Sequence, residues 1–237
     1  MKNEETTILT GFKELDELTG GFRKGELIFL AGRANMGEFS PFVVVSDIEK
    51  YCKKNNLNVY RVNKELDSLF TIFEKFEFIN IKIRKDGIQS ELKIPDLKLI
   101  EDFYLKKLFD INKNTKPDLI IICAIGLGTV SKYSFKFFKK AAKELNLPIL
   151  VFTIRSNSPD KQKDKHKNTS DFFNISKENI EKYNDKILFI YRNDNYDLSK
   201  SEKTETAEII VAKNNSGKTG TVELLFDKEN NSFKNRN

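Results

Sequence analysis

The stretch Glu26-Leu27-Ile28-Phe29-Leu30-Ala31-Gly32-Arg33-Ala34-Asn35-Met36-Gly37-Glu38-Phe39 decides the fold of this chain. Its first half is a short apolar run of the kind that forms a buried strand. Its second half has the glycine spacing of a phosphate-binding loop, G-x-x-x-x-G-K-[ST], with Gly32 and Gly37 as the two glycines. A strand that leads into such a loop predicts an α/β fold around a largely parallel sheet.

The two positions that carry the chemistry of this loop are changed. Glu38 stands where the loop has a lysine, and Phe39 stands where it has the serine or threonine that holds Mg²⁺. Each unit charge pair at about 4 Å and an effective dielectric near 20 is worth roughly 4 kcal/mol. The change therefore removes an attraction for phosphate and adds a repulsion of similar size.

The helix after the loop is expected to start late. Ser40 is a good N-cap, and Pro41 suits the first helical position. The residue before a proline also avoids the helical region. We therefore expect the helix to begin near Pro41, about one turn beyond the point at which a working loop directs its free N–H groups to the phosphates.

Several blocks of the chain resemble, in the same order, the C-terminal ATPase domain of DnaB-type replicative DNA helicases. These blocks are residues 10–27, 36–37, 59–66, 142–148, 188–192 and 206–213. The resemblance implies a RecA-like P-loop NTPase fold, with a mostly parallel central sheet flanked by helices and a C-terminal antiparallel hairpin. It places one domain over 10–230, a linker remnant at 1–9 and a tail at 231–237, and we expect no counterpart of the family's N-terminal collar domain.

The resemblance also implies roles for single positions, and most of the reacting set is missing. Glu65 matches the family's catalytic glutamate and is retained. The aspartate that helps to hold Mg²⁺ falls at Cys123, and a thiol is a poor ligand for this hard cation. The family's glutamine falls at Gly126 and its second polar sensor at Ile154. A glutamate without bound Mg·ATP has nothing to act on.

Two further sets of residues follow from the resemblance. The vestigial nucleotide-binding loop comprises Gly32, Arg33, Met36, Gly37, Glu38 and Phe39. Of the Lys-x-Arg pair with which the family reaches into the neighbouring subunit's site, Lys213 remains and the arginine is replaced by Asn215. We therefore expect neither ATP nor Mg²⁺ as a cofactor, although the parent family uses both, and no metal site.

A polar segment at 158–168 matches the position of a DNA-facing loop of the family. Its DNA-contact candidates are Lys161, Lys163, Lys165 and Lys167. The alternative is a solvated loop without a ligand. The net charge of +6 does little to decide between them, because 34 of the 41 basic residues are Lys, as an AT-rich genome would produce in any protein.

The remaining composition narrows the class of protein. Cys52 and Cys123 are too few for a disulfide framework, and a single histidine, His166, excludes a His-based zinc site. No long apolar run or signal-peptide pattern occurs, so we expect a cytoplasmic protein without membrane contact. Gly217-Lys218-Thr219 resembles the end of a phosphate loop, but its flanking strand patterns predict a hairpin turn.

Apolar periodicity and turn signals predict a βα alternation along the chain. Strands are expected at 26–31, 58–63, 79–83, 118–123, 148–153, 186–191, 207–212 and 221–226. Helices are expected at 12–19, 41–55, 65–77, 96–113, 133–146 and 176–183.

Two functional hypotheses follow. In the first, the chain is a non-catalytic relative of the replicative helicase that acts in DNA replication as a binding or regulatory protein. Its partners would be a full-length helicase or its loader, or single-stranded DNA, in a homo- or hetero-oligomeric ring. In the second, it is an active ATP-dependent helicase or ATPase, with Lys64 or Arg33 supplying the missing cation. A decayed gene product without a present function is a third alternative.

Overall fold

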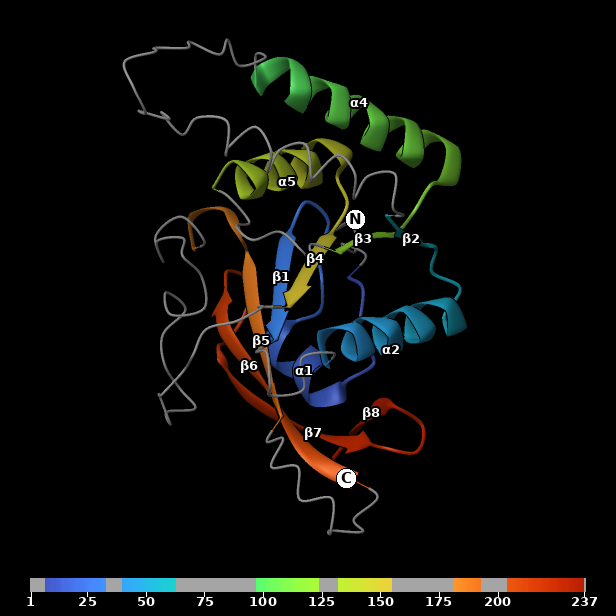
Figure 1. Ribbon diagram of the computed structural model, residues 1–237, viewed down its shortest axis with the longest axis vertical. Coiled ribbons are helices and arrows are strands. Elements are labelled where there is room, and N and C mark those ends of the chain that lie inside the picture. Colours follow the sequence, from blue (N-terminus) through green and yellow to red (C-terminus); the bar gives the residue numbers. More distant parts are fainter. Residues whose placement is uncertain are drawn as a thin grey trace, which may run out of the picture.

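The computed structural model describes residues 7–32, 40–62, 97–123, 132–154, 181–192 and 204–236. These residues form a three-layer α/β domain around one eight-stranded sheet with the order β2-β3-β4-β1-β5-β6-β7-β8 (Figure 1). The strands are β1 Leu27–Gly32, β2 Val59–Arg61, β3 Leu119–Cys123, β4 Ile149–Ile154, β5 Lys186–Arg192, β6 Thr204–Asn214, β7 Gly220–Asp227 and β8 Ser232–Asn235.

The sheet divides into a parallel part and an antiparallel part. Strands β2, β3, β4, β1 and β5 run parallel, whereas β6, β7 and β8 continue from β5 as antiparallel neighbours. Within the parallel part, β3, β4 and β1 are interior strands with apolar residues on both faces, and every residue of β1 is buried. This arrangement confirms the predicted fold class.

Helices cover both faces of the sheet. They are α1 Lys13–Thr19, α2 Ser40–Lys54, α4 Leu97–Thr115 and α5 Lys132–Leu145. Helices α4 and α5 lie on one face, and α1 and α2 lie on the other (Figure 1). Alternate residues of β1 therefore enter two cores: Phe29 packs with residues of α4 and α5, whereas Leu30 packs with residues of α1 and α2.

Most predicted elements in the described part agree with the structure to within a few residues. The strand predicted at 79–83 and the helix predicted at 65–77 lie outside the described residues. Of the helix predicted at 176–183, only 181–183 are described, and they are helical. No helix among the described residues is long and apolar enough to cross a membrane.

The structure corrects the prediction of a tail at 231–237. Residues Ser232–Asn235 form β8, which pairs with β7. The Phe233 ring packs on Phe226, with ring centroids 4.9 Å apart, and the Phe233 N–H donates to Asp47 Oδ2 on α2 at 2.8 Å. A single aromatic residue between polar neighbours gave too weak a strand signal, and the partner on α2 is distant in sequence.

Candidate nucleotide site and finger segment

Strands β1, β3 and β4 end together at one edge of the sheet, here called the carboxyl edge, at Gly32, Cys123 and Ile154. Gly32 pairs with Ile154 of β4, and Cys123 pairs with Phe152 slightly earlier on the same strand. The structure thus brings together three positions that the sequence assigned to one nucleotide site. Arg33, Met36, Gly37, Glu38 and Phe39 of the loop lie outside the described residues, as do Glu65 and Gly126.

Helix α2 packs directly on the first glycine of the loop motif. A Cβ atom on Gly32 would lie 2.5 Å from Pro41 Cγ and 2.7 Å from Pro41 Cδ. Real Cβ atoms do not approach other atoms so closely, so this contact requires glycine. The glycine of the motif is therefore explained by packing against the helix, whether or not the loop binds phosphate.

The expected N-cap at Ser40 is wrong. Ser40 lies within α2 rather than before it, and it is buried. Its Oγ has no hydrogen-bond partner among the described residues, so it does not accept from the N–H of Phe42 or Val43 as a capping hydroxyl would. Residues 33–39 lie outside the described part, so the displaced start of the helix remains a prediction.

The described residues of the carboxyl edge do not fit Mg²⁺. The last residues of β1, β2, β3 and β4 are Gly32, Arg61, Cys123 and Ile154, and none of them carries a carboxylate. Cys123 is half-buried and packs against the apolar core under α2. No group of three or more His, Cys, Asp or Glu residues in the described ranges could hold a metal ion. A soft thiol in an apolar environment is a poor substitute for the oxygen ligands that Mg²⁺ requires.

The finger segment lies at the opposite edge of the sheet, here called the amino edge, where β1 and β5 begin and β6 ends. Lys213 pairs with Ile187 near the start of β5, whereas Gly32 pairs with Ile190 farther along the same strand. At about 3.3 Å per residue, the two positions are separated by roughly 10 Å along the sheet. Lys213 therefore lies away from the nucleotide site of its own chain, as a residue that acts on a neighbouring subunit would.

Lys213 is bound within its own chain in the structure. Its Nζ donates to the backbone carbonyl oxygens of Glu181 and Asn184, the latter at 2.6 Å. Burial lowers the pKa of Lys213. Its partners lie at the end of the short helical segment 181–183, where carbonyl groups are left without intrahelical partners. Lys213 has a structural role here; its role toward a second subunit remains a prediction.

The turn Asn215–Thr219 connects β6 to β7, which confirms that Gly217-Lys218-Thr219 belongs to a hairpin. Asn214 fixes this turn, since its Nδ2 donates to Lys218 O at 3.0 Å and its Oδ1 accepts from the Ser216 N–H at 3.1 Å. A Cβ on Gly217 would lie 2.6 Å from Asn214 Nδ2 and 3.0 Å from Leu18 O. The turn is thus packed closely against the end of α1.

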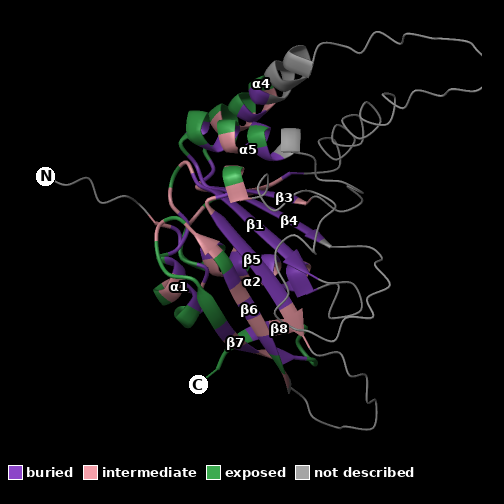
Figure 2. Cartoon of the chain, turned by 90° about the vertical axis from the view of Figure 1, so that its left-hand side faces the viewer, coloured by how far each residue is buried: buried purple, intermediate pink, exposed green. Residues whose placement is uncertain are grey.

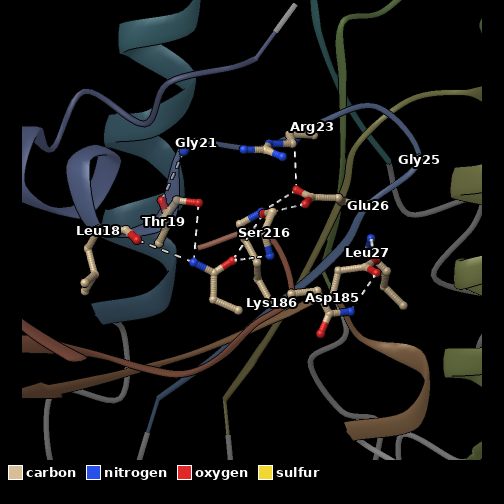
Figure 3. Close-up of polar contacts among 12 residues, drawn as sticks. Leu18, Thr19, Gly21, Arg23, Gly25, Glu26, Leu27, Asp185, Lys186 and Ser216 are labelled. Carbon is tan, nitrogen blue, oxygen red and sulfur yellow. Dashed lines mark hydrogen bonds and ion pairs between the residues drawn. The ribbon is translucent and has the colours of Figure 1, made fainter. Parts of the chain in front are cut away.

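A buried ion pair lies beneath this turn (Figure 3). The Lys186 side chain is 0% exposed, and its Nζ donates to Glu26 Oε2 at 2.5 Å and to Ser216 Oγ at 2.7 Å. The Ser216 hydroxyl donates to Glu26 Oε1 at 2.9 Å, and the Arg23 N–H donates to Glu26 Oε2 at 2.8 Å. Burial lowers the pKa of Lys186, an effect that Glu26 opposes. Sequence analysis did not identify this network.

Asp185 extends the same network. Its carboxylate accepts from the Leu27 N–H at 2.7 Å, from Lys139 Nζ of α5 and, more weakly, from Asn215 Nδ2 at 3.2 Å. Lys139 Nζ also donates to Gly25 O at 3.0 Å. Asn215, which the resemblance assigns to the position of the family's arginine, therefore contacts its own chain. The four DNA-contact candidates at 161–167 lie outside the described residues.

Comparison with known proteins gives one consistent relationship. The family model described as "DnaB-like helicase C terminal domain" matches residues 7–100 and 128–235. The chain is 28% identical to the replicative DNA helicase DnaB of Geobacillus stearothermophilus over 98% of its own length and 57% of that protein. It is 27% identical to the DnaB of Mycoplasma pneumoniae, over 96% of its length and 56% of the relative. The chain thus spans somewhat over half of these curated relatives.

Solved structures show the same fold. One that is described as an ATPase domain matches with a TM-score of 0.68 and 22% identity, covering 100% of this chain and 93% of that one. A DnaB-like replicative helicase, solved in a study of its interactions with primase, matches with a TM-score of 0.64 and 22% identity over 98% of this chain and 62% of that one. The match to the family model does not include residues 101–127, where Cys123 lies. The role predicted for Cys123 is therefore supported only by the position of β3 in the sheet. With most of its length matched by that model, the chain belongs to the family of DnaB-like helicase C-terminal domains.

Proposed function

We propose that this protein is a non-catalytic member of its family that acts in DNA replication as a binding or regulatory protein. The observation that carries the proposal is the position of Cys123. It ends β3, which β4 separates from β1, the strand that leads into the glycine motif, and the resemblance assigns to it the family's carboxylate for Mg²⁺. Together with Glu38 and Phe39 in the loop, this leaves the phosphates without a cation and Mg²⁺ without protein ligands.

In a ring, this chain would also affect the ATP site of the neighbouring subunit. In a ring of RecA-like domains, each ATP lies between the loop of one subunit and the finger of the next. Asn215 replaces the arginine of that finger and hydrogen-bonds to Asp185 of its own chain. A ring that included this chain would then have one site without phosphate affinity and one site without its arginine. We infer that it slows or stops an active helicase into which it is mixed.

The first test is calorimetric titration of the purified protein with Mg·ATP, far into the millimolar range. We expect no saturable heat and no thermal stabilisation, because a ligand that binds only the folded state must raise its stability. The matched control is the variant Glu38→Lys, Phe39→Thr, Cys123→Asp, which restores the family's three residues. Saturable Mg²⁺-dependent binding by the unmodified protein would support the active ATPase instead.

The restored variant also tests the path of the loop. Nucleotide affinity in that variant would show that only the chemistry of the site was lost. Failure to bind would show that the backbone also differs, as the expected late start of α2 predicts. Co-purification from the native cell then separates the two modes of action: recovery of a full-length helicase supports a ring subunit, whereas its absence at near-native concentration favours a separate module that binds DNA or a helicase loader.

A further inference from the structure

Helix α5 carries a row of exposed lysines that has no role in the proposed function. Lys136, Lys140 and Lys143 are exposed, and their spacing places them on one face of the helix. At about 1.5 Å per residue, the row extends over roughly 10 Å. The opposite face of α5 is buried against the sheet through Phe138 and Ala142, among others. Because the lysines are exposed and the opposite face is buried, the row lies on the side of the helix away from the core.

Most of the charge in this row is not neutralised by the described residues. Lys136 and Lys143 form no ion pair with them, and Lys140 has only the distant Glu144 at 3.9 Å. Lys139 lies between Lys136 and Lys140 in sequence, but its charge is neutralised by Asp185 at the amino edge. Exposed Lys24 adds a charge near the end of the row. The residue that follows it, Gly25, packs against the backbone of Lys143.

The neighbouring helix presents a similar surface. Helix α4 lies beside α5 on the same face of the sheet, and both carry exposed residues on their outer sides (Figure 1 and Figure 2). Lys106, Phe109, Asp110 and Lys113 of α4 are exposed with the spacing of one helix face, so one carboxylate lies among the lysines, and Phe109 is 41% exposed. An exposed aromatic ring beside lysines is a surface on which an unpaired base can stack.

We propose that the lysine row of α5 binds the phosphate backbone of a single-stranded nucleic acid. A line of charge about 10 Å long and one helix wide is long enough to contact a few successive phosphates of one strand. A protein partner is disfavoured, because its interface would need an apolar centre, and the described outer face of α5 offers none. Insertion into a membrane surface is disfavoured as well, because the apolar face of α5 is occupied by the core.

The test compares two variants that lose the same charge. The first is Lys136→Gln, Lys140→Gln, Lys143→Gln on α5. The second is Lys50→Gln, Lys53→Gln, Lys54→Gln on α2, where exposed lysines alternate with the acidic partners Asp47 and Glu49. Binding of a fluorescein-labelled oligothymidylate is followed by anisotropy between about 50 and 200 mM salt, the range in which phosphate contacts dominate the salt dependence. Far-UV circular dichroism verifies that each variant is folded.

The α5 variant is expected to bind at least about tenfold more weakly, with a log–log salt slope smaller by about 2, because each contact to a single strand contributes about 0.7. The α2 variant is expected to keep most of the wild-type slope. Equal losses of affinity in both variants would show that only net charge matters and would overturn the proposal. The absence of binding by the wild-type protein would overturn it as well. Competition by poly-glutamate as effective as that by unlabelled oligothymidylate would assign the row to an acidic protein partner instead.

Discussion

The two edges of the parallel sheet differ in what holds them together. At the carboxyl edge, the described packing around Gly32 and Cys123 is apolar: the Pro41 ring lies on Gly32, the Phe42 ring packs on Phe152 at 5.1 Å, and Cys123 packs against the same core. Ion pairs of this edge lie at the ends of β2 and β5, such as Arg61 with Glu49 at 2.7 Å. At the amino edge, the contacts are charged and buried, with Lys186 and Glu26 at their centre. The two edges therefore differ in whether charged groups lie at the centre of the packing.

This difference separates residues that maintain the fold from residues that perform chemistry. The Glu26–Lys186 pair links the start of β1 to the start of β5 and, through Ser216, to the hairpin turn, so its loss would affect folding whether or not ATP is used. A residue that only contacts a ligand is not needed for folding, so its type is free to change when the protein does not bind that ligand. We therefore expect substitutions at the amino edge to reduce stability strongly, and substitutions at the reacting positions of the carboxyl edge to leave it nearly unchanged.

The largest effect is expected from Glu26→Ala. It leaves the fully buried Lys186 with only the Ser216 hydroxyl as a partner, and breaking a buried pair in this way costs about 3–5 kcal/mol of unfolding free energy. Urea denaturation measures the change. The control is Glu144→Ala, which removes the partner of the exposed Lys140 and should cost less than about 1 kcal/mol. A small loss in Glu26→Ala would show that the two edges do not differ as proposed.

A second comparison uses one glycine at each edge. Gly32→Ala should destabilise the protein by about 1–3 kcal/mol, because its methyl group would overlap the Pro41 ring, and Pro41→Ala should restore part of that loss. Gly217→Ala at the amino edge should cost a similar amount, but there the Leu18 carbonyl belongs to the backbone and no single substitution removes the contact. Full tolerance of alanine at Gly32 would mean that the helix moves easily away from the loop.

The parallel strands could be predicted from sequence because their residues are buried on both faces, and continuous apolar runs such as Ile120–Ile122 are unmistakable. The strand β8 was missed because its contacts, which include the pairing with β7, the Phe233 ring and the hydrogen bond to Asp47, are made to other elements and leave no signal in the local pattern. Ser40 was misplaced for a related reason: its residue type favours a cap, but packing placed it inside the helix and buried its hydroxyl.

The candidate site was predictable to a similar extent. Gly32 was assigned to the nucleotide site from the glycine motif and Cys123 from the family resemblance, and the register places both at the carboxyl edge. The Lys186–Glu26–Ser216 network was not predicted, because its members are far apart in sequence and form no motif. The only local signal was a lysine at the start of an apolar strand, which is normally exposed; here it is 0% exposed.

The last and smallest expected effect is a difference in alkylation between the two cysteines, which reports on the carboxyl edge without a change in stability. Burial and the nearby carboxylates Asp118, Asp16 and Glu49 raise the pKa of Cys52 to about 11, so about 0.1% of this thiol is ionised at pH 8. Cys123 is more exposed. Iodoacetamide at pH 8 should therefore modify Cys123 and spare Cys52 until the protein is unfolded.

The same thiol then reports on nucleotide binding. If Cys123 occupies the place of the family's Mg²⁺ ligand, as the resemblance predicts, a bound Mg·ATP would shield it and slow its alkylation. We expect the rate to be the same with and without millimolar Mg·ATP, and peptide mapping distinguishes the two cysteines. The Cys52→Ala variant is the control, since it removes the second thiol from the measurement. Protection of Cys123 that requires Mg²⁺ would show that the carboxyl edge still binds nucleotide, and the contrast between the two edges would then lie in catalysis alone.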